Sequence, residues 1–373
     1  MQIDRRTMIA GTVALLAAAP ALAKRNAARS WYDRAIISDG LGGVGDPYAP
    51  ETQTRIGDRA WAETRTSGVT AVNQTILPVG NVADPWADFH KGVAEADGYI
   101  NANPDHLIKA LKVGDLKSAK DSGRVGVIYG TQDTAMVGEF LDRLAEMKKS
   151  GIRIVQLTYN LRNLSGDGAL EPRNAGISKL GRDTIARIEQ EKLLLDLSHG
   201  GARTISEAIA AAKRPLTISH TGSRALYDHP RNVSDESMKA VADKGGVVGI
   251  YFMPFLVPSS HPTIADLLRH IDHAANVVGE DHISVGTDGG IVPQPLDEEA
   301  RKQLRKWQQE RIDRGIAAPG EGLDVLPFLE ELNRIDRFQV VAAGLAKRGW
   351  SDSRLEKLFG ANLVRLYGEA WGG

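Results

Sequence analysis

Two histidines and an aspartate lie where three short apolar runs of the sequence end. His199 follows the run LLLDLS, His220 follows LTIS, and Asp288 follows ISVGT. Imidazole nitrogens and a carboxylate oxygen are ligands for a divalent metal, and three protein ligands leave a position open for water. A metal-bound water ionises near neutral pH and becomes a nucleophile. If the three run ends converge, the pattern predicts a metal or catalytic centre.

Other polar side chains follow further apolar runs. Gln132 comes just after VGVIYG, and Tyr159 and Asn160 come at the end of IRIVQLTY. Arg231 lies in the loop segment HPRN, where its guanidinium could hold a substrate carboxylate through two parallel hydrogen bonds or form a surface ion pair. These residues are candidates for substrate contacts at the same centre.

The remaining histidines are weaker candidates. His229 shares the loop of Arg231 and is either near the site or a turn residue. His270 and His273 lie in a helical pattern, HIDHAANVV, where a solvated or capping role is expected.

The elements that must position these residues are eight short, β-branched runs. Near-continuous apolar strands are typical of a parallel sheet covered on both faces. Strands that alternate with helical patterns favour a TIM (β/α)8 barrel, with a doubly wound sheet as the alternative. In such a barrel the chemistry lies at the C-terminal ends of the strands. The runs are 35–39, 69–77, 125–130, 152–159, 193–198, 216–219, 246–252 and 283–287.

Helical patterns lie between these runs. Apolar residues three and four positions apart predict helices over 137–151 and 202–214. No helix is preceded by G-x-G-x-x-G or G-x-x-x-x-G-K-[ST], which argues against a dinucleotide or nucleotide site. No serine lies in a G-x-S-x-G turn, so a serine hydrolase of the α/β-hydrolase type lacks its usual signature.

Composition excludes several other classes of protein. The chain has 373 residues, 46 basic and 47 acidic side chains, and a net charge of -1. A protein that neutralises many phosphates needs a surplus of Lys and Arg, so nucleic acid is not an expected partner. The chain contains no cysteine, which excludes disulfides, thiolate metal sites and a cysteine nucleophile.

The N-terminus has the layout of an export signal. Arg5 and Arg6 precede the apolar stretch GTVALLAAAPALA, which ends in small residues before Lys24. This arrangement resembles a twin-arginine signal peptide over 1–23. The apolar stretch is shorter than the ~20 residues that a spanning helix needs, so a stable membrane anchor is not expected after cleavage. We therefore expect a periplasmic protein with one barrel domain over 24–373.

Segments spread along the mature chain resemble the membrane dipeptidase (renal dipeptidase, peptidase M19) family of the amidohydrolase superfamily, in the order found in the family. The resemblance implies a barrel of the metal-dependent hydrolase type, with two zinc ions, that hydrolyses dipeptides and often accepts a D-residue on the C-terminal side. A homodimer would also be in keeping with it. The segments are GIRIVQLTYNLRN at 151–163, GDG at 166–168, KLLLDLSHGG at 192–201, PLTISHTGSRAL at 215–226, HPRNVSDE at 229–236, KGGVVGIYF at 244–252, GEDHISVGTDGG at 279–290 and LFGANLVRLYG at 358–368.

The resemblance assigns roles to individual positions. His199 and His220 match the histidines that bind the second metal, and Asp288 matches a carboxylate that binds metal and handles the proton. Arg231 matches the arginine that holds the substrate carboxylate. Tyr159 stands where some members have a histidine that contacts the scissile carbonyl.

The first strand departs from the family pattern. Members have Asp-Gly-His-x-Asp there, whereas this chain has Leu41 and Gly43 at the two ligand positions. Gln132 replaces the bridging glutamate, and its neutral amide would not screen two cations ~3.5–4 Å apart. We therefore expect that the binuclear centre does not form. One Zn²⁺ or none would bind, through His199 and His220 with help from Asp288 or Gln132.

Three hypotheses follow for the function. The first is a metal-dependent dipeptidase or small-amide hydrolase with a single ion, and it is the one we favour. The second is a metal-free enzyme in the periplasmic maturation of a peptide-derived metabolite. The third is a binding protein that retains the pocket without turnover. Metal content and the effect of a chelator on activity separate the first two, and binding without turnover identifies the third.

Overall fold

Eight parallel strands follow one another around a nearly closed barrel. The computed structural model describes residues 30–50, 52–80 and 82–372, so the expected signal peptide over 1–23 lies outside the described residues. The strand order never reverses, which confirms the barrel and excludes the doubly wound sheet. In order, the strands are β1 (Ser38–Asp39), β3 (Ala71–Thr75), β5 (Val125–Thr131), β6 (Ile152–Gln156), β7 (Leu194–Asp196), β8 (Thr217–Ser223), β10 (Val247–Ile250) and β11 (Ile283–Val285).

The barrel closes between its first and last strands. The Gly40 amide donates to the carbonyl of Val285 at 2.9 Å. Just beyond, β2 (Gly42–Gly43) pairs in parallel with β12 (Gly289–Gly290). The buried carboxylate of Asp39 accepts hydrogen bonds from the amide and hydroxyl of Thr287, at 2.8 and 2.6 Å. These contacts fix the backbone on both sides of the catalytic candidate Asp288.

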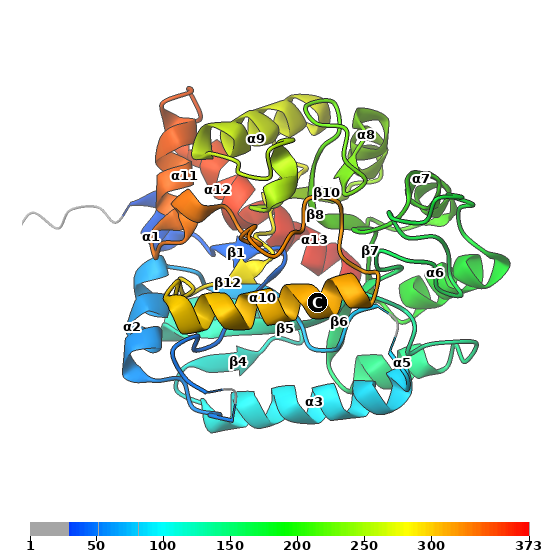
Figure 1. The fold of residues 1–373 in the computed structure, drawn as a ribbon, viewed down its shortest axis with the longest axis horizontal. Coiled ribbons are helices and arrows are strands. Elements are labelled where there is room, and N and C mark those ends of the chain that lie inside the picture. The colour runs from blue at the N-terminus through cyan, green and yellow to red at the C-terminus, as the bar shows by residue number, and fades with distance from the viewer. Residues whose placement is uncertain (1–29, 51, 81, 373) are drawn as a thin grey trace, which may run out of the picture.

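Helices surround the barrel (Figure 1). The helix predicted over 137–151 begins only at Arg143, because Gly138 has a φ of +57° and the preceding segment forms turns. The helix predicted over 202–214 is present as α7. The surrounding helices are α2 (Asp58–Ser67), α3 (Pro85–Ala102), α4 (Val113–Ser122), α5 (Arg143–Lys149), α6 (Lys179–Gln190), α7 (Ala202–Ala211), α8 (Asp235–Asp243), α9 (Ile264–Val278) and α11 (Arg337–Ala346).

Short elements complete the fold outside the path of eight strands. Strand β4 pairs with β5, and β9 pairs with β8. No helix in the described ranges is long and apolar enough to span a membrane. The short elements are α1 (Trp31–Arg34), β4 (Leu107–Lys109), β9 (Asn232–Val233), η1 (Pro254–Leu256), η2 (Glu330–Leu332), α12 (Asp352–Glu356) and η3 (Lys357–Ala361).

The C-terminal helix α13 (Asn362–Trp371) packs on one end of the barrel interior. Its buried face, including Leu366 and Trp371, belongs to one apolar cluster with inward-facing strand residues such as Ile128, Ile154 and Leu194. This packing fills the end of the barrel at which the strands begin. The opposite end, where the strands finish, is left for the site.

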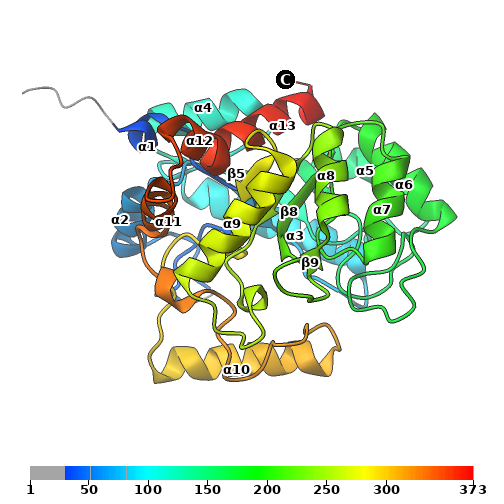
Figure 2. The same cartoon turned by 90° about the horizontal axis from the view of Figure 1, so that it is seen from above.

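One long helix lies apart from the others, at the opposite end from α13 (Figure 2). It is α10 (Glu298–Asp313), which crosses in front of the barrel in Figure 1. Asp297 caps its first turn by accepting a hydrogen bond from the Ala300 amide. The negative charges of Glu298 and Glu299 interact favourably with the positive N-terminal end of the helix dipole. The helix lies over the C-terminal ends of the strands, and none of the predicted site residues belongs to it.

Candidate active site

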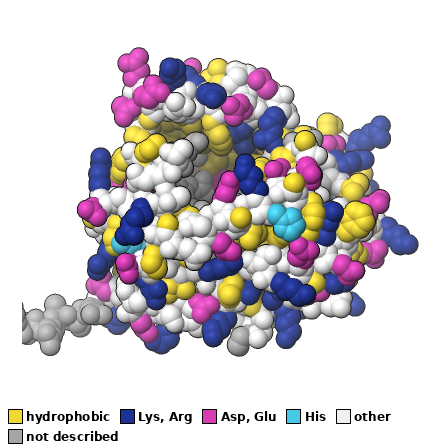
Figure 3. Space-filling view, turned by 90° about the horizontal axis from the view of Figure 1, so that it is seen from below, with side chains coloured by type: hydrophobic (Ala, Val, Ile, Leu, Met, Phe, Trp, Pro, Cys, Tyr) yellow, Lys and Arg dark blue, Asp and Glu magenta, His cyan; other side chains and the backbone are white. Residues whose placement is uncertain are grey.

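A cavity of about 980 Å³ opens at the C-terminal ends of the strands. Figure 3 shows the molecule hollowed, with hydrophobic side chains along the wall of the hollow. The cavity lining includes five of the candidates that the sequence singles out, namely Gln132, Tyr159, His199, Arg231 and Asp288. The fold therefore brings together residues that are separated by up to 156 positions in the chain.

The rings of His199 and His220 meet edge to face beside this cavity. Their centroids lie 4.8 Å apart. Both side chains are buried, and the Nε2 atom of each has no hydrogen-bond partner in the described structure. Two buried ring nitrogens without partners are unusual, because a buried polar group normally has one. Such atoms are available to a metal ion or a proton donor.

The tautomer of His199 follows from its neighbour Asn160. The amide nitrogen of Asn160 donates to the carbonyl of Ile316 at 2.8 Å, so its oxygen faces Nδ1 of His199 at 2.6 Å. An amide oxygen only accepts, so Nδ1 carries the proton. In the neutral ring, Nε2 then bears a free lone pair. Asn160, predicted as a substrate contact, lies behind His199 and orients it.

A chain of hydrogen bonds through Ser219 to Asp196, called the relay below, fixes the tautomer of His220. The hydroxyl of Ser219 donates to the buried carboxylate of Asp196 and lies 2.8 Å from Nδ1 of His220. Since the hydroxyl proton is used by Asp196, Ser219 accepts from Nδ1–H. Burial raises the pKa of Asp196, while hydrogen bonds from Ser219 and Ser198 oppose that rise. Nε2 of His220 is therefore also free.

Both imidazoles are held neutral. Burial keeps the pKa of His199 and of His220 well below the usual value, and the positive charge of Arg231 lowers both pKa values further. A neutral ring with a proton on Nδ1 is the form that binds a metal through Nε2. The pair therefore presents two neighbouring neutral rings, each with a nitrogen lone pair that has no partner among the described residues.

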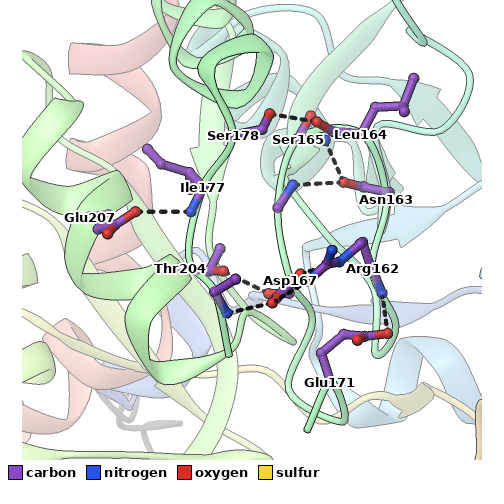
Figure 4. A network of polar contacts seen from close by, with 12 residues as sticks. Arg162, Asn163, Leu164, Ser165, Asp167, Glu171, Ile177, Ser178, Thr204 and Glu207 are labelled. Carbon is purple, nitrogen blue, oxygen red and sulfur yellow. Dashed lines mark hydrogen bonds and ion pairs between the residues drawn. The ribbon is translucent and has the colours of Figure 1, made fainter. Parts of the chain in front are cut away.

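The loop between β6 and α6 supports this arrangement (Figure 4). Its buried Asp167 accepts from Arg162 at 2.6 and 3.0 Å, and the hydroxyl of Thr204 donates to the Asp167 carbonyl at 2.7 Å. A Cβ on Gly168 would lie 2.0 Å from the carbonyl oxygen of Tyr159, so only glycine fits there. The closely packed loop explains the GDG motif.

His199 has a strained backbone that this loop stabilises. Its φ is +62°, a region that residues other than glycine enter at a cost. The amide of Ala169 donates to the His199 carbonyl at 2.7 Å. Asp288 has a similar φ of +56°, and its amide donates to the Leu41 carbonyl at 2.8 Å. Such strain clusters at functional sites.

Asp288 faces the cavity beside two arginines. Burial raises the pKa of this carboxyl to about 6, and the charges of Arg231 and Arg311 oppose the rise. A carboxyl with a pKa near 6 is ionised at neutral pH and can still accept a proton from water. Asp288 is therefore suited to be a general base.

Arg231 is buried and oriented by its own loop. Its backbone amide donates to Nδ1 of His229 at 3.2 Å, and Nε2 of His229 faces the carbonyl of Pro319 at 2.8 Å. The hydroxyl of Thr221 donates to the Arg231 carbonyl at 2.9 Å. His229 therefore orients the backbone of the Arg231 loop and has both ring nitrogens occupied.

Sequence reasoning missed the pair Arg311 and Glu321, which also lines the cavity. Arg311 comes from α10, and its Nη2 atom lies 2.8 Å from a carboxylate oxygen of Glu321. Its Nη1 donates to the hydroxyl of Tyr159 at 3.0 Å. The only signal in the sequence is an arginine among many charges on a polar helix.

The first strand holds no ligand pair. Leu41 is buried, and an added Cβ on Gly43 would meet nothing within 4 Å. Gln132 lines the cavity, and its amide nitrogen donates to the Thr75 hydroxyl at 2.9 Å. No cluster of three or more His, Cys, Asp or Glu side chains able to hold a metal occurs among residues 30–50, 52–80 and 82–372.

These observations limit the metal site that the resemblance implies. The free Nε2 atoms of His199 and His220 fit one divalent ion as two nitrogen ligands. Leu41 and Gly43 offer no side-chain donor, so the residues do not fit a second ion.

The structure corrects the expectation for His270. This residue is buried, with Nε2 2.9 Å from the Leu256 carbonyl and Nδ1 accepting from the Ser223 amide at 3.0 Å. It joins α9 to the end of β8 and to η1, and it is neither solvated nor a cap. His273 lies 2.8 Å from a carboxylate oxygen of Asp235 on α8.

Solved structures with the same barrel support the assignment of the fold. An amidohydrolase from Pseudomonas aeruginosa aligns with a TM-score of 0.78 and 29% identity, over 92% of this chain and 98% of that chain. A metallopeptidase from Rhodobacter sphaeroides, liganded with a phosphinate mimic of the dipeptide L-Ala-D-Ala, aligns with a TM-score of 0.71 and 17% identity, over 90% and 100%. The second likeness concerns the fold alone.

Two curated proteins are similar to this chain in sequence. Dipeptidase tcpJ of Claviceps purpurea is 24% identical over 71% of this chain and 56% of its own length, and an uncharacterized dipeptidase of Schizosaccharomyces pombe is 29% identical over 58% and 46%. The match thus spans about half the length of these relatives. The family model "Membrane dipeptidase (Peptidase family M19)" matches residues 87–318, which is more than half of the chain. The chain therefore belongs to the membrane dipeptidase family.

Proposed function

We propose that the protein hydrolyses the amide bond of a dipeptide or a related small amide, with a water molecule activated at a centre that holds a single divalent ion. The observation that carries the proposal is the pair of free Nε2 atoms on His199 and His220 beside the cavity that contains Arg231 and Asp288. Family membership supports a hydrolase of the dipeptide type.

Each charged group has a defined part in this reaction. Arg231 holds the substrate carboxylate, because a guanidinium can donate two parallel hydrogen bonds to it. Asp288 accepts a proton from the attacking water as the new C–O bond forms. It then returns that proton to the amine that leaves when the C–N bond breaks. The reaction consumes one water molecule, and Asp288 ends in the same protonation state in which it began.

His199 and His220 would hold the ion through Nε2. When bound, the ion would lower the pKa of a water molecule and polarise the scissile carbonyl. Asn160 and Ser219 keep the two imidazoles in the tautomer that ligation needs. The buried position of the rings excludes bulk water from the ligands.

We expect purified protein to contain about one equivalent of divalent metal, measured by elemental analysis after loading with Zn²⁺. Changing His199 and His220 together to Ala should remove the metal and the hydrolysis of a dipeptide and amide panel. The variant His273→Ala, at a partly exposed histidine of α9 outside the cavity, is a control for histidine loss. Less than about a tenth of an equivalent in the wild type would refute the single-ion centre.

A metal-free enzyme is the second candidate, because the described residues contain no group of three metal-binding side chains. It predicts activity that survives a chelator and is lost in Asp288→Asn. Activity that a chelator abolishes and Zn²⁺ restores would exclude it. Ligand binding without turnover would instead favour a binding protein.

The relay from Asp196 to His220 gives a further prediction. In Asp196→Asn, an amide nitrogen facing Ser219 would donate to its hydroxyl, which would then donate to Nδ1 of His220 and leave the proton on Nε2. Zn²⁺ affinity should fall about 10–100-fold, as for other changes behind a metal ligand. Isothermal titration with Zn²⁺ measures it.

Asp133→Asn is the matched control for this variant. Asp133 is also buried near the strand ends, but it accepts from the amides of Thr134 and Ala135 and from Asn163 instead of acting on a histidine. Equal losses of Zn²⁺ affinity in the two variants would show that the effect comes from a missing buried charge and would contradict the relay.

A further inference from the structure

The last turn of α10 and the segment that follows it contact the barrel at three of the residues that build the site. Arg311 donates to the Tyr159 hydroxyl, the Ile316 carbonyl accepts from Asn160, and the Pro319 carbonyl lies 2.8 Å from Nε2 of His229. Asn160 orients His199, and His229 orients the Arg231 loop. The segment 311–319, outside the eight strands, therefore helps to assemble the site.

Arg311 is the one charged side chain in this segment that reaches the cavity with a fixed geometry. Its Nε donates to Glu321 at 2.9 Å, and its Nη2 donates to both carboxylate oxygens at 2.8 and 3.0 Å. The Trp307 ring lies 4.9 Å from the guanidinium carbon. Both charged side chains are only 10% exposed. Glu321 therefore balances the charge of Arg311 and fixes its orientation.

The contact with Arg311 leaves the hydroxyl proton of Tyr159 free to be donated to another group. A guanidinium has only donors, so the Tyr159 oxygen accepts from Arg311 and keeps its own proton for another partner. Among the described residues the hydroxyl makes no further hydrogen bond. The ring is stacked on His199 with centroids 4.2 Å apart, and the side chain lines the cavity. The hydroxyl proton is thus available to a ligand in the cavity.

We propose that Arg311 is a positioning residue that holds Tyr159 so that its hydroxyl donates to the carbonyl oxygen of the scissile amide as negative charge develops on it. This inference rests on the proposed function. A fixed donor at the place where charge develops stabilises the transition state more than the substrate. The nearby guanidinium strengthens the donor because it withdraws electron density from the hydroxyl oxygen. Tyr159 acts on the substrate, and Arg311 acts through Tyr159.

A double-mutant cycle on steady-state kinetics tests this coupling. Tyr159→Phe should lower kcat about 100-fold, as expected for the loss of one such donor, and change KM less than threefold. Arg311→Met should lower kcat about tenfold. Because Arg311 acts through the hydroxyl, Arg311→Met should add less than twofold in the Tyr159→Phe background. Arg311→Lys should recover part of the loss.

Two further measurements separate positioning from folding. Arg305→Met is the matched control, because Arg305 lies on the same helix and pairs with the exposed Asp324 at 3.0 Å. It should keep kcat within twofold of the wild type. The affinity for a phosphinate dipeptide mimic, measured by calorimetry, should fall in Arg311→Met by about the same factor as kcat, whereas product affinity should not change.

Three results would overturn the inference in protein that melts as the wild type does. They are a wild-type kcat in Arg311→Met, a loss confined to KM, and a full tenfold loss in the Tyr159→Phe background. A wild type that hydrolyses no dipeptide or amide overturns the proposed function itself, and the inference with it. An active wild type with an unaffected Arg311→Met overturns only the inference.

Discussion

Asp288→Asn is expected to lower kcat for amide hydrolysis by about a thousandfold. The amide cannot accept the proton of the attacking water, and general acid–base catalysis contributes roughly 10²–10⁴-fold. The substitution keeps the shape of the side chain and the backbone hydrogen bond to Leu41. Since the variant leaves unchanged the proposed contact of Arg231 with the substrate carboxylate, KM should change little. Stopped-flow or steady-state assays at saturating substrate measure the loss.

The pH profile gives a second readout of the same residue. Burial raises the pKa of Asp288 to about 6, and only the ionised form can act as the base. The wild-type kcat/KM should therefore rise with pH through about 6 and reach a plateau above it. In Asp288→Asn the residual rate should lose this step. A variant that keeps the step would show that another group is the base.

The same variant should be more stable than the wild type at neutral pH. The pKa of Asp288 is higher in the folded chain than its ordinary value of 3.8, so the folded state binds the proton more tightly. The contribution of this carboxyl to the free energy of unfolding is complete below about pH 3.8 and is lost as the pH rises through about 6. The difference corresponds to at most about 3 kcal/mol.

Denaturant unfolding of metal-free protein checks this sign. Asp288→Asn should gain stability over the wild type at pH 7.5, and the gain should vanish near pH 4, where the wild-type carboxyl is protonated. Glu299→Gln on the first turn of α10 changes charge outside the site and serves as the control. A gain that is the same at both pH values would contradict burial as the cause.

The barrel and the positions of its strand-end residues could be predicted from the sequence for a physical reason. Strands buried on both faces are continuous apolar runs, and each run is followed at once by the polar residue that it presents at the mouth. His199 and Asp288 could thus be placed beyond the ends of β7 and β11, whereas His220, expected to follow a strand ending at 219, lies within β8 (Thr217–Ser223). Local sequence contains this information because the strand and the residue that it presents are adjacent.

The supports of these residues could not be predicted, because they depend on partners distant in the chain. The tautomer of His199 depends on the Ile316 carbonyl, which fixes the amide of Asn160 from 156 positions away. Helix α10 carries charges on most of its surface, so no apolar stripe marks Arg311 as the buried one. Burial of His270 likewise depends on the Ser223 amide at the end of β8 and the Leu256 carbonyl in η1.

Restoring side-chain donors after the first strand and at Gln132 is expected to add a second metal ion. The variant combines Leu41→His, Gly43→Asp and Gln132→Glu, which places an imidazole and two carboxylates where the family resemblance has ligands. The open space around Gly43 accepts a side chain, since a Cβ there meets nothing within 4 Å. The glutamate supplies the negative charge that two cations ~3.5–4 Å apart require. Elemental analysis should rise from about one to about two equivalents.

A variant with Leu41→His and Gly43→Asn, and with Gln132 retained, separates ligand chemistry from repacking. It has nearly the same side-chain volumes but no added carboxylate, so it should stay at one ion, because a lone imidazole does not offset the repulsion between two cations. Two ions in the wild type would refute the interpretation of Leu41 and Gly43. One ion in a well-folded triple variant would show that the barrel mouth, and not the missing side chains alone, excludes the second metal.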